Sequence, residues 1–285
     1  MLDPDALMRL RFLATDRAAS GAATALPGGH VTKRRGRGLE TAEIRPFTQG
    51  DDPRHLDRNA TARTGQLHTR THMAERDRTT MLIADFRPAM LWGTRRVFRS
   101  VAAAEQLCLI GWRAVAAGGR VAALALTACG PFHARPAGRD RGMVAAIGTL
   151  LDAHRAALTR PEAAGPPLSD GVALAETLAP RGAEIWLASG FDAPGDGIGE
   201  ALAGLARRTR PGLIRIADAF EQQRRPGRYR IALPDGRRMA ARLGAASLTG
   251  AGATLISQLC TDLGLPLETV ESTPDPLAAW GGAHG

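Results

Sequence analysis

The sequence predicts an α/β fold: a mostly parallel, doubly wound sheet with helices on both faces and a small β-rich insertion near the N-terminus. Three short apolar runs, TTMLIAD, RVAALALT and AEIWLAS, have the length and composition of buried strands. Longer segments with apolar residues at helical spacing lie between them. Strands that alternate with helices form parallel sheets, because each helix returns the chain to the edge where the previous strand began.

Two parts precede the α/β domain. Residues 1–35 are expected to form a helix over residues 1–20 and then a Gly/Ala-rich loop that ends in basic residues. Residues 36–78 form a charged segment in which AEIRPF and LHTRTHM both alternate with the period of a β-strand. Turn-forming residues separate these two predicted strands.

The α/β domain is expected over residues 79–285. Its first strand ends at Asp85 and its third buried strand ends at Ser189, and ligand sites in parallel sheets lie at such carboxyl ends. PFHARP is expected to pair beside the second strand, and RYRIALPDGRRMAARL to form a hairpin. The predicted strands lie at 79–85, 120–127, 183–189, 212–218 and 267–273, and the predicted helices at 94–119, 139–158, 170–179, 197–209 and 246–263.

Charge gives a weak functional signal. The chain has a net charge of +9 and a pI near 11.0, and 36 of its 37 basic residues are arginine. A basic chain invites a nucleic-acid interpretation. However, the arginines are spread along a sequence rich in Ala, Gly and Pro, and a single tyrosine with few other aromatic residues offers little base stacking. The basic clusters are Lys33-Arg34-Arg35, Arg95-Arg96, Arg207-Arg208 and Arg224-Arg225.

The sequence indicates a cytoplasmic protein. No stretch approaches the roughly 18 consecutive apolar residues of a membrane span, and the charged N-terminus lacks the apolar run of a signal peptide. Cys108, Cys129 and Cys260 are far apart and odd in number, which favours buried thiols in a reducing compartment over disulfides or a metal site.

Common catalytic signatures are missing from the sequence. It contains no phosphate-binding G-x-x-x-x-G-K-[ST], no dinucleotide-binding G-x-G-x-x-G, no H-E-x-x-H and no G-x-S-x-G. His68 and His72 share a face of one predicted strand, but about 13 Å separates such positions, too far to hold one metal ion. We therefore expect no catalytic residues, no metal and no cofactor, and rank a hydrolase built on Asp85 and Ser189 third among the alternatives.

Residues 36–65, GRGLETAEIRPFTQGDDPRHLDRNATARTG, form the strongest candidate for a partner surface. The segment alternates as strands do, contains a turn around Pro53 and balances its charges, unlike a flexible linker. Its charged side chains either form ion pairs that fix the loop shape or project toward a protein partner, since arginine is favoured at interfaces. The candidate partner-binding residues are Arg37, Glu40, Glu43, Arg45, Asp51, Asp52, Arg54, Asp57 and Arg63.

The same segment and the strand after it carry a family resemblance. The run from Gly36 to Asp85 is similar to the signature of the bacterial domain of unknown function 58 family, with its G-R-G-x-E-F and G-D-D-x-R-x-I-D-W segments. The later stretch DAFEQQRRPGRYRIALPDG is similar to a second family segment. Thr41 and Arg58 stand where the family has phenylalanine and tryptophan. The resemblance implies a von Willebrand factor A-like α/β domain.

The resemblance also implies a degenerate metal site. Von Willebrand factor A domains bind Mg²⁺ through D-x-S-x-S after the first strand, a threonine from a later loop and a later aspartate. The sequence DFRPA keeps Asp85 but has Arg87 and Ala89 in place of the serines, while Gly190 replaces the later aspartate and Ser169 takes the threonine position. We therefore expect no Mg²⁺ to bind, with Arg87 either paired to Asp85 or pointing to solvent.

For function, the resemblance implies a partner. Members of this family are typically encoded beside MoxR-type AAA+ ATPases and other von Willebrand A proteins, in systems that resemble chaperones for client complexes. The expected function is thus a non-enzymatic adaptor that docks such an ATPase or its client through the charged segment. The alternative is a basic nucleic-acid-binding protein, which the scarcity of aromatic residues disfavours.

Overall fold

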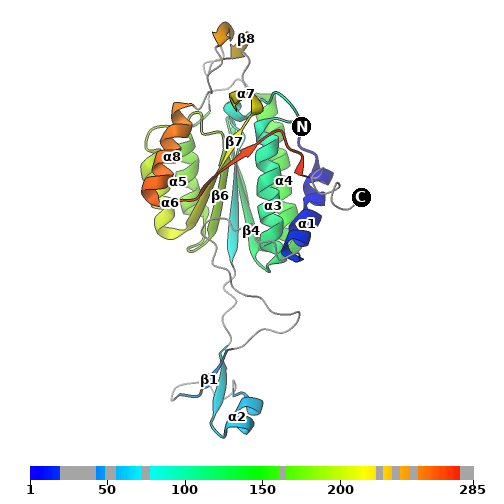
Figure 1. Ribbon diagram of the computed structural model, residues 1–285, viewed down its shortest axis with the longest axis vertical. Coiled ribbons are helices and arrows are strands. Elements are labelled where there is room, and N and C mark those ends of the chain that lie inside the picture. Colours follow the sequence, from blue (N-terminus) through cyan, green and yellow to red (C-terminus); the bar gives the residue numbers. More distant parts are fainter. Residues whose placement is uncertain are drawn as a thin grey trace. The chain divides into compact units, whose positions relative to one another are not determined.

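Two units make up the chain, residues 29–77 and the remainder, 1–28 with 78–285. Both units contain helices and strands (Figure 1). The computed structural model describes residues 1–19, 43–48, 56–71, 78–160, 165–222, 227–232, 238–243 and 250–276.

A six-stranded sheet forms the centre of the larger unit. Its strand order is β10-β7-β6-β3-β4-β5, and every neighbouring pair is parallel except β4 and β5. The predicted α/β class with a mostly parallel sheet is therefore confirmed, as is the strand expected beside RVAALALT. The strands are β3 (Thr79–Asp85), β4 (Arg120–Thr127), β5 (Gly130–Gly138), β6 (Glu184–Ser189), β7 (Arg210–Ala217) and β10 (Leu267–Glu271).

Helices cover both faces of this sheet (Figure 1). On one face α1, α3 and α4 share a core with Leu82 and Ala84 of β3, and on the other α5, α6 and α8 share a core with Met81 and Ile83. Successive residues of a strand point to opposite faces, so the apolar β3 serves both cores. These helices are α1 (Pro4–Ala19), α3 (Arg99–Ala116), α4 (Arg139–Thr159), α5 (Leu168–Leu178), α6 (Ile198–Arg208) and α8 (Ala251–Leu263).

The helix after β3 is shorter than the sequence predicts. It begins at Arg99 rather than at Thr94, because the backbone N–H and the hydroxyl of Thr94 both donate to the carboxylate of Asp218. These bonds accompany a run of bends over residues 94–97. A short 3-10 helix, η2 (Pro88–Met90), precedes the bends, and the single-turn helix α7 (Ala219–Gln222) follows β7.

The predicted hairpin is present as β8 (Gly227–Ala232) and β9 (Arg238–Leu243), which pair antiparallel. Its turn, residues 233–237, lies outside the described residues. The ring of Phe220 in α7 meets that of Tyr229 in β8 edge-on, with centroids 4.9 Å apart. Among the helices that the structure describes, each is too short or too polar to cross a membrane.

Within residues 43–48 and 56–71, the smaller unit contains a two-stranded antiparallel sheet and one helix. Both predicted strands are present, as β1 (Glu43–Pro46) and β2 (His68–Thr71). The sequence did not predict the helix between them, α2 (Arg58–Thr64), because its seven residues carry no apolar periodicity. Asp57 starts this helix: its carboxylate accepts hydrogen bonds from the N–H groups of Asn59 and Ala60, each at 2.9 Å.

Candidate functional site

The two strand ends that the sequence marks as candidates for a ligand site, those of β3 and β6, bring their polar side chains together. The hydroxyl of Ser189 donates to Oδ2 of Asp85 at 2.6 Å, across 104 residues of sequence. β3 and β6 are adjacent parallel strands, so their last residues lie at the same edge of the sheet. Both side chains are buried, with Asp85 1 % exposed and Ser189 fully buried.

Arg87 pairs with Asp85 through both oxygens of the carboxylate. Its Nε donates to Oδ1 and its Nη2 to Oδ2, each at 2.9 Å, and its backbone N–H donates to Oδ1 at 3.0 Å. Burial alone raises the pKa of Asp85, but the charge and hydrogen bonds of Arg87, with the Ser189 hydroxyl, more than offset it and hold that pKa below its usual range. Of the two expected orientations of Arg87, the structure thus shows the paired one.

The remaining amino group of Arg87 ties two further loops to this pair. Nη1 donates to the carbonyl of Ala193 at 3.1 Å and to that of Pro166 at 3.3 Å. Ala193 follows β6, and Pro166 precedes α5. The guanidinium of Arg87 therefore joins the loops after β3, before α5 and after β6, and its Nε, Nη1 and Nη2 all donate in these contacts.

The residues at this edge do not fit a magnesium ion. Both oxygens of Asp85 are engaged by Arg87, and Ala89 and Gly190 bring no ligand atom, as the sequence predicts. Ser169, at the second position of α5, uses its N–H to bond the carbonyl of Pro194 at 3.0 Å. Mg²⁺ requires near-octahedral oxygen ligands. In the described part of the chain no group of three or more His, Cys, Asp or Glu residues is arranged to hold a metal ion.

Arg99, which the sequence analysis did not single out, is fully buried beside this pair. Its Nε donates to the carbonyl of Ile216 at 2.9 Å, and its Nη1 forms an ion pair of 3.0 Å with Asp192. The Trp92 ring lies over the guanidinium, 5.2 Å from its centre. A Cβ atom added at Gly190 would overlap Nη2 of Arg99, so the glycine is required at this position. The guanidinium thus occupies the space that a side chain at residue 190 would need.

Asp218 is a second buried residue that the sequence analysis missed, although it lies in the family-like stretch DAFE. It accepts hydrogen bonds from Thr94, from the N–H of Phe220 and from the hydroxyl of Ser272. Burial raises its pKa, but these hydrogen bonds outweigh burial and lower it. Glu221, three residues later, binds Arg215 at 2.8 Å. The two acids hold the loop before α3 and the ends of β7 and β10 together.

A serine and a histidine lie within hydrogen-bonding distance elsewhere in the larger unit. Oγ of Ser100 in α3 is 3.1 Å from Nε2 of His154 in α4. Both are buried, at 0 % and 1 % exposure, and burial lowers the pKa of His154 to about 4. Because no substrate reaches them in this arrangement, the pair joins two helices rather than forming a nucleophile and base.

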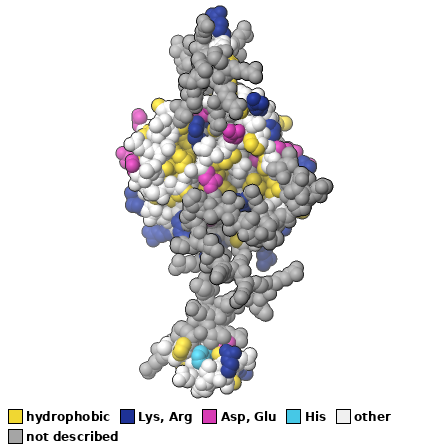
Figure 2. All heavy atoms as spheres, viewed as in Figure 1, with side chains coloured by type: hydrophobic (Ala, Val, Ile, Leu, Met, Phe, Trp, Pro, Cys, Tyr) yellow, Lys and Arg dark blue, Asp and Glu magenta, His cyan; other side chains and the backbone are white. Residues whose placement is uncertain are grey.

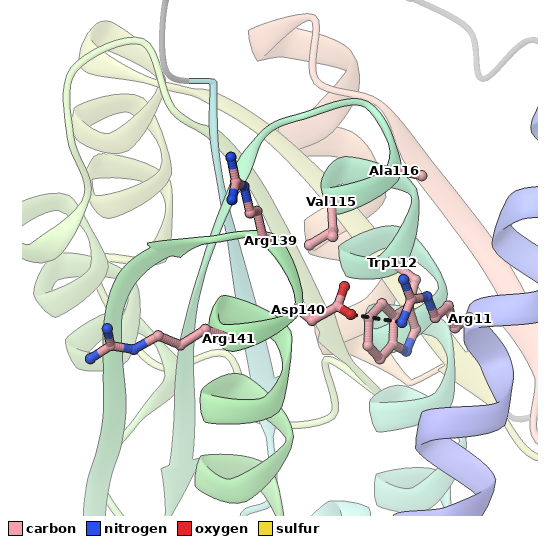
Figure 3. A pocket seen from close by; sticks show the side chains of 7 residues that line it. All are labelled: Arg11, Trp112, Val115, Ala116, Arg139, Asp140 and Arg141. Carbon is pink, nitrogen blue, oxygen red and sulfur yellow. Dashed lines mark hydrogen bonds and ion pairs between the residues drawn. The ribbon is translucent and has the colours of Figure 1, made fainter.

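A pocket of about 430 Å³ lies at the opposite edge of the sheet. Gly138, which precedes α4, pairs with Arg120 at the start of β4, whereas Asp85 pairs with Leu126 near its end. Figure 3 shows Arg11 bound to Asp140 beside the Trp112 ring, with Arg141 directed away from them. The pocket is lined by Arg11, Trp112, Val115, Ala116, Arg139, Asp140 and Arg141. It therefore belongs to the amino edge and shares no residue with the Asp85 site.

The predicted partner-binding residues fall into four groups. Asp57 is 3 % exposed and caps α2, so its position serves the helix rather than an exposed contact. Arg63 is exposed on α2. Glu43 and Arg45 lie on β1. The others, Arg37, Glu40, Asp51, Asp52 and Arg54, lie outside the described residues.

The expectation of buried thiols holds for two of the three cysteines. Cys108 and Cys260 are buried, and burial raises the pKa of both, that of Cys260 to about 11. Cys129 is exposed, contrary to the expectation, because it lies in the tight turn between β4 and β5.

Fold and site together define an α/β domain in which an internal arginine–carboxylate pair closes the carboxyl edge of a mostly parallel sheet. The chain belongs to the family of proteins of unknown function DUF58, whose model matches residues 43–238. It is similar to the crystal structure of the conserved hypothetical protein BatB from Bacteroides thetaiotaomicron, with 15 % sequence identity and a TM-score of 0.46 over 73 % of this chain and 96 % of that one. A search of curated proteins found no significant match.

Proposed function

We propose that this protein is a non-enzymatic, cytoplasmic adaptor with a von Willebrand factor A-like domain. It works with a MoxR-type AAA+ ATPase in the chaperone-like maturation or activation of a client complex. Membership of the DUF58 family supports the proposal, because the resemblance to that family implies an association with such ATPases. The charged segment of the smaller unit and the carboxyl edge of the sheet are its two candidate contact surfaces.

The Asp85–Arg87 pair is the observation that carries this proposal. In a metal-dependent relative, an ion at this edge would present an open coordination position to a ligand. Here a guanidinium lies on the carboxylate, with 8 % of the Arg87 side chain exposed, and its donors reach three loops. The arrangement fixes the shape of a surface, and the Ser189 hydroxyl is buried and bonded to Asp85, which favours binding over catalysis.

Association with the ATPase tests the proposal. The full-length chain and a MoxR-type ATPase from the same genome would be co-purified with ATP, with ADP and without nucleotide. We expect a complex in at least one nucleotide state, because AAA+ proteins change shape through their cycle. No association in any state would refute the adaptor function.

A matched pair of surface variants makes this experiment sharper. Arg63 and Arg58 are both exposed on α2, and only Arg63 belongs to the predicted partner surface. We expect Arg63→Glu to weaken association about tenfold, equivalent to about 1.4 kcal/mol. Arg58→Glu makes the same charge change at the helix N-terminus, where an acidic residue is favourable, and should leave association unchanged. Equal effects of the two variants would exclude α2 as the contact surface.

An arginine-rich surface at the amino edge favours a second candidate function, nucleic-acid binding. Arg181, Arg207, Arg208 and Arg210 are exposed and form no ion pair with any described residue. Arg207 and Arg208 end α6 and Arg210 begins β7. Arg181 lies close to them, since the N–H of the next residue, Gly182, donates to the carbonyl of Arg208 at 2.7 Å. Figure 2 shows basic side chains gathered at the lower edge of the larger unit. Basic residues also stabilise the C-terminus of α6, which is their simpler explanation.

A mobility-shift assay separates these two functions. Nucleic-acid binding through this surface predicts a shift of labelled single- and double-stranded RNA and DNA that weakens steeply with salt. The double variant Arg207→Ala/Arg208→Ala should abolish it, whereas Arg155→Ala, on the exposed face of α4, should not. A shift that is absent even at low salt removes this second candidate.

A further inference from the structure

The buried guanidinium of Arg99 has one amino group without an acceptor. The side chain is 0 % exposed, and Nη2 has no hydrogen-bond partner among the described residues. Nε donates to the carbonyl of Ile216. Nη1 pairs with Asp192 and donates to the carbonyl of Ala89 at 3.4 Å. A buried donor without an acceptor is rare and costly, so an unfilled position of this kind indicates a missing oxygen atom.

Asp192 pairs with only part of the Arg99 guanidinium, and it does so from the solvent side. The Asp192 side chain is 41 % exposed and its Oδ2 lies 3.0 Å from Nη1, whereas Nη2 has no hydrogen bond to it or to any other described residue. Arginine binds carboxylates most strongly when two parallel N–H groups meet both oxygens. The resident carboxylate therefore leaves the hydrogen-bonding position on Nη2 unfilled.

The loop that carries Asp192 is held in an unusual backbone conformation. The preceding residue, Phe191, has a φ of 57°, in the left-handed region that non-glycine residues rarely adopt. Gly195 and Gly197, later in the same loop, have φ values of 84° and 74°. A conformation that costs energy at a non-glycine residue is kept only where the surroundings impose it, so the contacts around Phe191 hold this loop in place.

Asp192 also lies in the field of a second buried cation. Burial alone would lower the pKa of Arg87. The charge of Asp85 and, to a smaller extent, that of Asp192 outweigh burial, so the pKa of Arg87 is raised. Asp85 neutralises Arg87 directly, whereas Arg99 shares the more distant Glu221, 3.7 Å away, with Arg215. Of the two described acids that pair with Arg99, Asp192 and Glu221, Asp192 is therefore the one that solvent can reach.

We propose that Asp192 is an internal placeholder for a carboxylate side chain from an acidic segment of a partner protein. The partner's carboxylate displaces Asp192 and binds both Nη1 and Nη2 of Arg99, which completes the fork. This deepens the adaptor function and rests on it, because it names the chemistry by which the carboxyl edge recognises a partner. The exchange replaces one anion with another, so it adds no net buried charge, and it fills the unsatisfied donor.

A peptide-binding experiment tests this exchange. The probe is a short, fluorescein-labelled peptide of alternating glutamate and glycine, followed by fluorescence anisotropy with the full chain. Asp192→Asn removes the resident carboxylate and should tighten binding about tenfold. Asp196→Asn is the matched control: it makes the same charge change in the same loop, at an exposed residue with no ion pair among the described residues, and should change binding less than about twofold.

Further arms of the experiment identify the ligand and the receptor. Arg99→Lys keeps the charge but loses the fork, and should abolish the gain produced by Asp192→Asn; its folding is checked by thermal unfolding. If Arg99→Lys fails to fold, the comparison of the two asparagine variants still decides. A phosphoserine–glycine peptide that binds more tightly than the glutamate peptide would overturn the assignment to carboxylate.

The outcomes separate this inference from the proposed function. If the two asparagine variants bind the peptide equally while the native chain co-purifies with the ATPase, the placeholder is refuted and the adaptor function stands. If Asp192→Asn binds the peptide about tenfold more tightly but no ATPase co-purifies, the carboxylate receptor is supported and its partner is a different acidic protein.

Discussion

Replacing Arg87 with methionine would leave the buried carboxylate of Asp85 without its guanidinium partner. The variant loses two charged hydrogen bonds, each 2.9 Å long, while the backbone N–H of residue 87 and the Ser189 hydroxyl remain. Hydrogen bonds to charged groups contribute about 1.5–3 kcal/mol each, and breaking a buried pair costs about 3–5 kcal/mol. We expect the free energy of unfolding to fall by about 3–5 kcal/mol at pH 7.

The pH dependence of this loss provides the stronger test. In the native protein the pKa of Asp85 lies below its ordinary value of 3.8, so its stabilising contribution is present above that value and is lost as pH falls through the lower folded pKa. In Arg87→Met the effect of burial is no longer offset, and the pKa of Asp85 rises. A raised carboxyl pKa destabilises the fold only at pH values where the unfolded chain is ionised. The difference between variant and native protein should therefore decrease between pH 7 and pH 4, because the penalty from the raised pKa in the variant declines, while the contribution of the native pair persists down to about pH 3.8.

Urea unfolding at pH 7 and near pH 4, followed by fluorescence of the buried Trp112 and Trp186, measures both quantities. The double variant Asp85→Asn/Arg87→Met is the control, since it removes the charge as well as its partner. It should recover most of the lost stability and show no difference between the two pH values. A cost below about 1 kcal/mol for Arg87→Met at pH 7, or a cost independent of pH, would refute the reasoning.

Three further outcomes follow from neighbouring features. Gly190→Ala should destabilise the protein by about 1–3 kcal/mol in thermal unfolding, because the new Cβ meets Arg99; Gly148→Ala, which has open space in α4, should not destabilise it. His154, with a folded pKa of about 4 against an ordinary 6.5, should contribute stability that is complete above pH 6.5 and declines by roughly 3 kcal/mol as pH falls to about 4; in His154→Leu this slope should vanish from the urea data. Calorimetric titration should detect no saturable Mg²⁺ or Mn²⁺ binding, and micromolar binding abolished by Asp85→Ala would prove that expectation wrong.

The fold was predictable because each of its central strands is long enough and apolar enough to be recognised in the sequence without the others. Strands buried on both faces have little polar content, and β3, β4 and β6 all appear in the sequence as such runs. The sequence also placed Asp85 and Ser189 at strand ends. Their contact did not follow from it, because it depends on β3 and β6 being neighbours in the sheet. The short α2 did not follow, because a capping aspartate and a seven-residue helix leave almost no periodic signal.

The charged interior of the site could not be predicted in the same way. An arginine in a basic chain is normally exposed, and nothing local distinguishes the buried Arg99 from its neighbours Arg95 and Arg96. Asp218 reaches Thr94 across 124 residues, a contact that depends on the register of the folded sheet. From the sequence, Gly190 was interpreted as the loss of a metal ligand. The structure gives a further reason for the glycine, because it leaves room for the guanidinium of Arg99.

An ion-dependent surface can be switched off by withdrawing the ion. At the carboxyl edge of this sheet the cation is a side chain, two residues from the carboxylate that it neutralises. A chelator cannot extract it, and a change in cellular Mg²⁺ concentration cannot alter its occupancy. The contacts that join these loops therefore form as the chain folds and need no bound ion. If binding at this edge is timed in the cell, withdrawal of an ion cannot be the signal, because the cation that joins the loops is part of the chain.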